Sequence, residues 1–388
     1  MLALFSILIG GYLALASFYM LLFAIGAKVN STKTTIQLSS KVSSTASMAV
    51  FIPAYKEDAV IVEVATKALA QDYNNYTVIV IADSLKPVTL ERLKELPIEV
   101  VEVDFEQSTK VKALNHAMNQ LTSNYEIAVI LDADNVMEAQ FLAKMNVAYH
   151  QGAKVIQGRR IAKNKTGSYA LLDALSEAIN NNIYNLGQIN LGFSARLVGS
   201  GMAFEYDLFK RLMQDSVAVG GFDKELELKL LEQKAFIHYV DNAIVWDEKV
   251  SKVAVFAKQR RRWLAAQYHY LKEYGGRAIR ALFLKGNLDF FNKICQMALP
   301  PRLLLPVFLA MGSVLTYLLG SNTAWIWFWG LLANLMANLI SIPKEMFTIE
   351  LFKALIKLPI AIFFMFFSLF KIKGANKKFY HTPHGEEK

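Results

Sequence analysis

Two uncharged apolar stretches, one near each end of the chain, constrain the architecture more than any other feature of the sequence. Residues 1–27 contain no charged side chain, and neither do residues 303–343. A membrane-crossing helix needs about 20 predominantly apolar residues, so the first stretch suffices for one crossing and the second for two. Ser321 and Asn322 lie near the middle of the second stretch and predict the turn between its two helices.

The charges beside these stretches predict their orientation. Lys28 and Lys33 follow the first stretch, and Arg302 and Lys344 flank the second. Because basic residues favour the cytoplasmic side of a membrane, we expect these flanks and the chain between them to lie inside the cell. A cleaved signal peptide is the alternative for residues 1–27, but this stretch lacks a basic start and exceeds a signal core in length.

A third apolar run, at residues 358–370, is too short for a comfortable crossing. If it crossed, the four lysines at positions 371, 373, 377 and 378 would lie outside, against the charge bias. We therefore interpret residues 344–388 as an amphipathic or re-entrant helix with a basic cytoplasmic tail. The expected protein is a multi-pass protein of the cell (inner or plasma) membrane with three spans and a cytoplasmic catalytic domain.

The overall composition agrees with a membrane part and limits the classes of partner. Hydrophobic residues make up 54% of the 388 residues, and the net charge is +9. The positive charge fits either the bias beside membrane spans or attraction to anionic lipid headgroups and nucleotide phosphates. No basic stripe with a recognisable binding motif is present, which argues against nucleic acid as a partner. Cys295 is the only cysteine, so the chain forms no internal disulfide.

Between the apolar ends, short apolar runs alternate with amphipathic stretches such as residues 59–71 and 110–121. Continuously apolar runs suit strands that are covered on both faces, so this order predicts an α/β domain with an open, largely parallel sheet. The predicted strands are residues 49–55, 78–82, 98–103 and 127–131. The predicted domains are a transmembrane helix at 1–27, a linker at 28–47, the α/β domain at 48–290, and an interfacial segment with two transmembrane helices at 291–343.

Three aspartates follow the predicted strands at the edge where an open α/β sheet binds its ligand. Asp83 comes after one strand, and Asp132 and Asp134 come after another, so we expect the three carboxylates to gather there. Two aspartates separated by one residue can hold Mg²⁺ or Mn²⁺, which prefer oxygen ligands and often share them with substrate phosphates. A chance Asp-x-Asp loop is the alternative, and the position after an apolar strand favours the metal site.

Two further patterns each have a structural and a functional interpretation. On a helix, Gln259, Arg262 and Trp263 share one face, where Arg suits a phosphate and Trp a sugar ring. A basic helix lying on lipid uses the same residue types. Asp223 precedes a predicted helix and is either its N-cap or a general base directed at an acceptor hydroxyl.

Short motifs occur in a fixed order between residues 50 and 263. They are Pro53-Ala-Tyr55 with Glu57, Lys110 with Ala113-Leu-Asn115, Asp132-Ala-Asp134, Gln157-Gly-Arg159, Gly199-Ser-Gly201, Asp223 with Glu225-Leu226, and Gln259-x-x-Arg262-Trp263. In this order they resemble family 2 glycosyltransferases, in the branch of cellulose, chitin and hyaluronan synthases. Lys56 and Phe222 depart from the Asn and Glu that the family commonly has at these positions.

The resemblance implies a GT-A (Rossmann-like) domain with a mixed, mostly parallel sheet, together with transmembrane helices. It implies Mn²⁺ or Mg²⁺ bound by Asp132 and Asp134, and Asp223 as the catalytic base. The donor-binding residues that it implies are Pro53, Tyr55, Glu57, Asp83, Lys110, Asn115, Asp132 and Arg159. The acceptor- or diphosphate-binding residues that it implies are Gly199, Ser200, Gly201, Gln259, Arg262 and Trp263.

The implied activity is inverting transfer of a sugar from a UDP- or GDP-sugar to a hydroxyl of a glycan or lipid-linked acceptor. The implied role is polysaccharide biosynthesis at a membrane, and membrane lipid is a further expected partner. A processive synthase that extrudes its polymer is one competing hypothesis, which would need oligomers or an export partner because three spans are few for a channel. Transfer onto a polyprenyl phosphate is a second hypothesis, and a non-catalytic membrane scaffold is a third.

Overall fold

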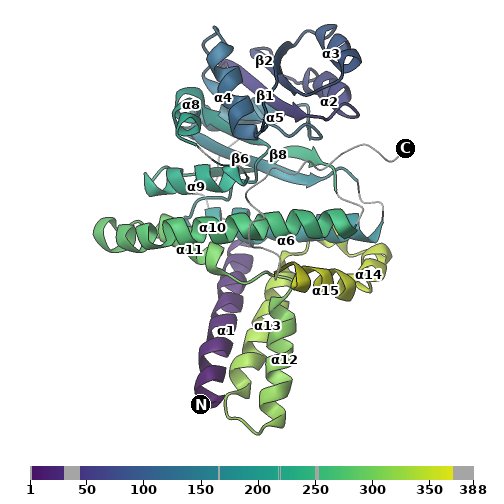
Figure 1. The fold of residues 1–388 in the computed structure, drawn as a ribbon. Helices are drawn as coiled ribbons and strands as arrows, with labels where there is room; N and C mark the ends of the chain where they lie inside the picture. The colour runs from purple at the N-terminus through teal and green to yellow at the C-terminus, as the bar shows by residue number, and fades with distance from the viewer. Residues whose placement is uncertain are drawn as a thin grey trace.

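The computed structural model describes residues 2–29, 44–164, 167–216, 218, 220–249 and 253–369. Figure 1 shows an α/β domain at one end, a bundle of long helices at the other, and a layer of crosswise helices between them. Lys33, most of the predicted linker and the four lysines after residue 370 lie outside the described residues.

The α/β domain is built on an eight-stranded mixed sheet with the order β3-β2-β1-β4-β7-β6-β8-β5. The first four strands are parallel, β7 is antiparallel to both of its neighbours, β8 is parallel to β6, and β5 is antiparallel to β8. The strands are β1 Met48–Tyr55, β2 Tyr76–Asp83, β3 Glu99–Val103, β4 Ile127–Ile130, β5 Val136–Met137, β6 Val155–Ala162, β7 Met202–Glu205 and β8 His238–Asp247. The predicted mixed, mostly parallel sheet and its four predicted strands are confirmed.

Helices cover both faces of the sheet because successive side chains of each central strand point to opposite faces. In β1, Ala49 and Phe51 pack against α4, α8 and α9, whereas Val50 and Ile52 pack against α2 and α5. Burying a side chain as large as Phe51 contributes about 1.5–3 kcal/mol to stability. The helices of these layers are α2 Ile61–Ala68, α3 Pro87–Lys94, α4 Lys110–Gln120, α5 Phe141–His150, α8 Tyr206–Gln214 and α9 Phe222–Glu232.

A crosswise layer of helices separates the sheet from the bundle (Figure 1). In this layer α6 continues through a π-helical turn at Asn182–Leu186 into α7. The other members are the 33-residue α10 and the helix α11, which pack against each other. The bounds are α6 Ser168–Asn181, α7 Gly187–Asn190, α10 Val253–Lys285 and α11 Leu288–Ala298.

The bundle consists of α1 Leu2–Gly26, α12 Leu305–Leu318 and α13 Ala324–Ser341, which run side by side. Small residues allow close approach: a Cβ added to Gly330 of α13 would lie 2.9 Å from the Ala14 Cα of α1. Ser321 and Asn322 lie in the connection between α12 and α13, as predicted. After a 3₁₀ turn at Lys344–Met346, α14 Ile349–Leu355 packs beside α6, and α15 Leu358–Leu369 packs beside α10.

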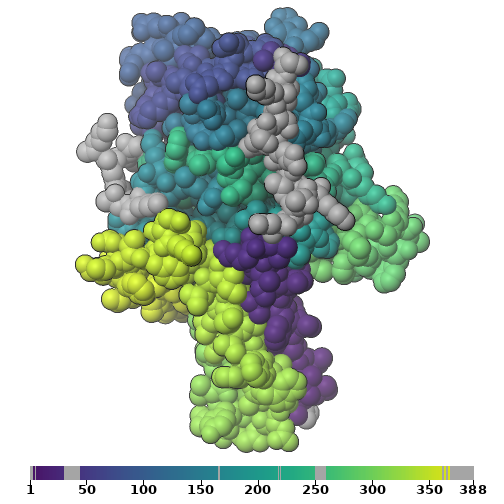
Figure 2. All heavy atoms as spheres, turned by 180° about the vertical axis from the view of Figure 1, so that it is seen from behind, coloured from purple at the N-terminus to yellow at the C-terminus, as the bar shows by residue number. Residues whose placement is uncertain are grey.

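Among the described helices, two are long and apolar enough to cross a membrane, at Ser6–Gly26 and Ala324–Ser341. The 14 residues of α12 span about 21 Å, which is short of a hydrocarbon core of about 30 Å. Two of the three predicted spans thus correspond to helices of spanning length, and the third, α12, is shorter. Figure 2 shows the bundle projecting as a narrow stalk, on which large apolar side chains such as Leu15 and Leu318 are exposed. In Figure 1, α15 runs across the direction of the bundle.

Candidate active site

A cavity of about 500 Å³ lies where the parallel strands end, and it extends between the sheet, α6 and α10 toward the start of α12. Loops after β1, β2 and β4 supply one wall, as expected for an open α/β sheet. Most of the residues predicted for the site line this cavity. They are Pro53, Tyr55, Glu57, Asp83, Lys110, Asp132, Asp134, Gly199, Asp223, Gln259, Arg262 and Trp263.

Asn115, Ser200 and Gly201 do not line the cavity. The Asn115 Nδ2 donates to the Met213 carbonyl at 2.9 Å and so joins α4 to α8, because this face of α4 packs on its neighbour. The Ser200 Oγ accepts from the Asp132 backbone N–H at 2.9 Å and hydrogen-bonds the Asn135 side chain. Ser200 and its neighbour Gly201 therefore hold the Asp132 loop in place instead of facing the cavity.

Arg159 also lies outside the cavity lining, and the next residue takes its place. In the pairing of β6 with β8, Gly158 is opposite Val240 but Arg159 is opposite Ile244, so β8 bulges between them. Asp241 lies in that bulge, and its Oδ2 is 3.2 Å from Arg159 Nη1. The following arginine, Arg160, lines the cavity instead.

The loop after β4 presents the paired aspartates. The Oδ1 atom of Asp132 lies 2.5 Å from Lys110 Nζ, which also donates to the Gly199 carbonyl at 2.9 Å. Asp134 is buried, and its carboxylate accepts from Asn135 Nδ2 at 3.0 Å and from the Glu248 backbone N–H at 3.3 Å. Local hydrogen bonds therefore fix the Asp134 carboxylate in the cavity wall.

Asp83 lines the same cavity as this pair, as expected, but it does not form a three-carboxylate metal site with Asp132 and Asp134. Among the described residues no three His, Cys, Asp or Glu side chains are arranged to hold a metal ion. Asp83 is the last residue of β2, is 3% exposed, and accepts hydrogen bonds at 3.0 Å from the hydroxyls of Ser84 and Ser108. Burial raises the pKa of Asp83, although the two hydroxyls partly oppose this effect. Two hydroxyls thus fix one acidic acceptor at the strand end.

The pair Asp132 and Asp134 alone fits a divalent cation that shares its remaining ligands with a substrate. Mg²⁺ is commonly held by one or two carboxylates together with substrate phosphates. The donor set on the protein is all oxygen, as this class of cation requires.

Asp223 is not an N-cap, so the structural interpretation of this residue is wrong. Helix α9 begins at Phe222, and its N-cap is Gly221, which has a φ of 70° and no side chain that could accept a hydrogen bond. The Asp223 carboxylate lies 3.8 Å from Lys224 Nζ and faces the cavity wall formed by Gly199. A Cβ added to Gly199 would lie 3.9 Å from Asp223 Cγ, so glycine leaves the space beside this carboxylate open.

Helix α10 contributes Gln259, Arg262 and Trp263 to the cavity, which favours a role in the site over a lipid-facing one. Burial lowers the pKa of the Arg262 guanidinium, and the charges of Asp132 and Asp223 oppose that effect, so Arg262 lies near both aspartates. Arg260 is 5.0 Å from the Trp263 ring centroid and donates to Asp173 of α6 at 2.7 Å. These contacts join α10 to α6 across the cavity.

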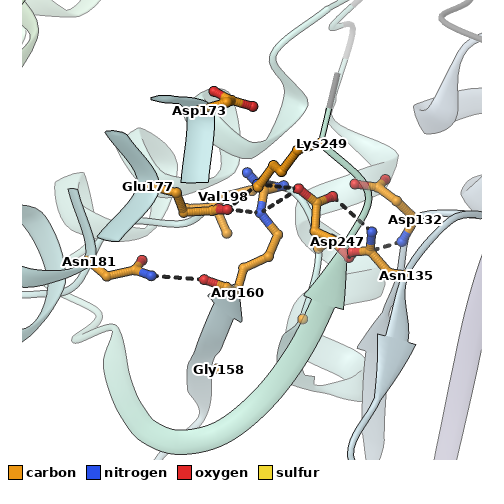
Figure 3. Close-up of polar contacts among 12 residues, drawn as sticks. Asp132, Asn135, Gly158, Arg160, Asp173, Glu177, Asn181, Val198, Asp247 and Lys249 are labelled. Carbon is orange, nitrogen blue, oxygen red and sulfur yellow. Dashed lines mark hydrogen bonds and ion pairs between the residues drawn. The ribbon is translucent and has the colours of Figure 1, made fainter. Parts of the chain in front are cut away.

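A buried charge network behind the Asp132 loop was missed by the sequence interpretation. Figure 3 shows it running from Glu177 of α6 through Arg160 and Lys249 to Asp247, which accepts from Asn135 Nδ2 at 3.0 Å. Burial alone would raise the pKa of Asp247, but Arg160 and Lys249 lower it to about 2. The network therefore keeps Asp247 ionised.

The polar residues of α6 recur at helical spacing and were the available sequence signal for this wall. Asp173, Ser176, Glu177 and Asn180 all line the cavity, at intervals of three, one and three residues, which places them on one face of the helix.

Comparison with solved structures supports the fold. The mannosyltransferase PcManGT from Pyrobaculum calidifontis, in complex with GDP-mannose and Mn²⁺, is 19% identical with a TM-score of 0.53, and the match covers 85% of this chain and 99% of that one. Glucosyl-3-phosphoglycerate synthase from Mycobacterium tuberculosis, in complex with Mn²⁺ and UDP, is 17% identical with a TM-score of 0.40, over 57% of this chain and 78% of that one. A comparison with curated protein sequences gives no significant match.

The sequence profile of one family matches the part of the chain that builds the cavity. Residues 46–266, more than half of the 388-residue chain, match the family described as "Glycosyltransferase like family 2". The matched range begins just before β1 and ends within α10, so it contains Asp83, Asp132, Asp134, Asp223 and Arg262. The chain therefore belongs to glycosyltransferase-like family 2, and it is a glycosyltransferase.

Proposed function

We propose that this protein is an inverting, metal-dependent glycosyltransferase that moves a sugar from a UDP- or GDP-sugar to a hydroxyl of a glycan or lipid-linked acceptor at the cytoplasmic membrane face. The observation that carries the proposal is that Asp223, the Asp132–Asp134 pair and Arg262 line one cavity. A carboxylate base, an oxygen ligand pair and a cation are the groups that this transfer requires. A role in polysaccharide synthesis is part of the same proposal.

Mn²⁺ or Mg²⁺ would be held by Asp134 and Asp132 together with the donor diphosphate. When bound, such an ion offsets the negative charge that develops on the leaving diphosphate. Lys110 neutralises Asp132 in this structure and, like Arg262, lines the same cavity as the pair, so both side chains are available to a donor phosphate oxygen.

Asp223 accepts the proton of the acceptor hydroxyl as its oxygen attacks the anomeric carbon of the donor sugar. The bond from that carbon to the diphosphate oxygen breaks in the same displacement, so the configuration at the anomeric carbon inverts. Asp83 accepts hydrogen bonds from the nucleotide base, because its carboxylate is fixed at the end of β2. Trp263 offers an apolar wall to a sugar ring.

The apolar stalk supports the membrane part of the proposal. The cavity extends to Pro301, Arg302 and Leu303, immediately before α12, so an acceptor held near the membrane could reach it. A processive synthase, as in the cellulose, chitin and hyaluronan synthase branch, is compatible with the same cavity. A carboxylate base favours a hydroxyl acceptor over a polyprenyl phosphate, which needs no deprotonation.

Donor turnover by the purified full chain tests the proposal. The protein is incubated with UDP- and GDP-sugars and Mn²⁺, and release of UDP or GDP is measured, with Asp134→Ala as the inactive control. We expect release from at least one donor by the parent and none by the variant. Absence of release from every donor would contradict the proposal and favour a non-catalytic scaffold.

A further inference from the structure

Part of the cavity wall, called the basic end below, carries an excess of positive charge. This basic end contains six cationic and four anionic side chains. The cations are Arg160, Arg196, Lys249, Arg260, Lys293 and Arg302, and the anions are Asp173, Glu177, Glu227 and Asp247.

Four of the six cations are neutralised by carboxylates. Arg160 pairs with Glu177 at 2.7 Å, Arg260 pairs with Asp173 at 2.7 Å, and Lys249 contacts both Glu177 and Asp247. The fourth pair joins Lys293 Nζ to Glu227 Oε1 at 2.5 Å, with both side chains buried. The remaining cations are Arg196 and Arg302.

Within the described part of the chain, neither Arg196 nor Arg302 forms an ion pair. The Arg196 Nε is buried and has no hydrogen-bond partner there. Arg302 donates only to neutral groups, to Asn338 Oδ1 at 2.8 Å and to Ser176 Oγ at 2.8 Å. The charges of Glu227 and Glu177 act on Arg196 from a distance. Glu227 is already paired with Lys293, and Glu177 with Arg160 and Lys249, so neither Arg196 nor Arg302 has a carboxylate of its own among the described side chains.

The two arginines flank Tyr184 of the π-helical turn. The Arg196 guanidinium carbon is 5.8 Å from the Tyr184 ring centroid, and the charge of Arg302 also acts on this tyrosine. Burial lowers the pKa of both arginines, that of Arg302 to about 10. Unpaired charge in such surroundings is costly, so an anion bound between them would be favoured.

This basic end differs from the donor end of the cavity. Lys110 pairs with Asp132, and the charges of Asp132 and Asp223 act on Arg262. Arg302, in contrast, is influenced by Tyr184, Arg260 and Arg196. Arg302 lies three residues before the first residue of α12, next to the apolar stalk. An anion held here would be at the membrane side of the cavity.

We propose that Arg196 and Arg302 bind the phosphate of a lipid acceptor, whose hydrocarbon chain lies along α12 and whose acceptor hydroxyl points toward Asp223. The planar guanidinium groups suit phosphate oxygens, with which arginine forms charge-assisted, often bidentate hydrogen bonds. This inference rests on the proposed function and adds the substrate class: the phosphate is an anchoring group of the acceptor and is not the nucleophile.

Binding of three probes to the full chain in maltoside detergent tests the inference. The probes are dodecyl phosphate, dodecanol and inorganic phosphate, titrated by calorimetry. We expect dodecyl phosphate to bind about tenfold or more tightly than either of the others. Arg196→Gln and Arg302→Gln should each weaken its binding by about ten- to a hundredfold, since a hydrogen bond to a charged group is lost.

Two further variants control for charge and folding. Arg280→Gln removes an exposed arginine of α10 outside the cavity and should leave dodecyl phosphate binding unchanged. Arg302→Lys keeps the charge, so it should bind dodecyl phosphate more tightly than Arg302→Gln does. If Arg302 served only to hydrogen-bond Asn338 and Ser176, no such difference would be expected. The Arg196 side chain forms no such hydrogen bonds, so Arg196→Lys is the variant to test if a glutamine variant fails to fold.

Equal binding of dodecyl phosphate and dodecanol, or parent-like binding by both glutamine variants, would overturn the inference. Inorganic phosphate that binds as tightly as dodecyl phosphate would overturn the lipid assignment and indicate a soluble phosphorylated ligand. Binding of UDP and GDP in the presence of Mn²⁺ is measured on the same preparation without lipid. Its absence contradicts the proposed use of a nucleotide-sugar donor whatever the phosphate titration shows, so the two failures are distinguishable.

Discussion

Replacing Asp223 by asparagine separates catalysis from stability at this position. Asp223 is the second residue of α9, and its side chain is 16% exposed and makes a loose ion pair with Lys224 at 3.8 Å. A carboxylate in the first turn stabilises a helix by about 0.3–1 kcal/mol through the helix dipole. An ion pair as long as that between Asp223 and Lys224 adds little to this. A loss of about 1 kcal/mol lowers the melting temperature of a domain of this size by roughly 2–4 °C.

Loss of a general base has a far larger effect on the chemical step. We expect Asp223→Asn to reduce the transfer rate by roughly 10²–10⁴-fold, which corresponds to about 2.7–5.5 kcal/mol. The assay is donor turnover with acceptor present, together with thermal melts and binding of the nucleotide in Mn²⁺. Nucleotide binding should stay close to that of the parent.

Asp207→Asn is the matched control. Asp207 lies in the first turn of α8, is exposed and does not line the cavity. Its replacement should lower stability as little as Asp223→Asn does and should leave turnover unchanged. Near-parental turnover by a folded Asp223→Asn protein would refute the reasoning and require the base to lie elsewhere.

Three more predictions concern the metal, the nucleotide and the topology. Excess chelator or Asp134→Ala should abolish turnover, and added Mn²⁺ should restore only the chelated parent; full turnover in chelator would exclude the metal. Burial raises the pKa of Asp83, so its carboxylate should become protonated at a higher pH than an ordinary aspartate does. Nucleotide affinity, titrated against pH, should therefore decrease at that higher pH in the parent, and this decrease should be absent in Asp83→Asn. A reporter fused after Lys388 should be active only in its cytoplasmic form, because four lysines follow residue 370; activity restricted to an external form would show another span.

The sheet and most of the cavity could be predicted from sequence because local pattern determines them. The apolar runs of β1, β2 and β4 are continuous because both faces are buried, and Asp83 and Asp132 at the ends of β2 and β4 follow directly. In helix α10, the spacing of Gln259, Arg262 and Trp263 alone places their three side chains on one face.

The position of Arg160 in the cavity wall, where Arg159 was predicted, could not be foreseen because it depends on a bulge in another strand. Which of two adjacent arginines faces the cavity is set by the extra residues of β8 opposite Gly158 and Arg159. The start of α9 illustrates a similar limit. Asp223 has the residue type of an N-cap, but the N-cap is Gly221, which has a positive φ, so the helix begins two residues earlier than that interpretation expects. Arg196 and Arg302, more than 100 residues apart, both act on Tyr184 only because the tertiary fold brings all three to one cavity.

The anomeric configuration of the product tests the central claim most directly. A donor with an α-linked sugar is turned over by the purified protein with acceptor and Mn²⁺, and the coupling of the anomeric proton is measured by NMR before the product equilibrates. A single displacement assisted by Asp223 predicts a β-linked product. An α-linked product would contradict the account, because retention requires a different arrangement of catalytic groups from the one base proposed here.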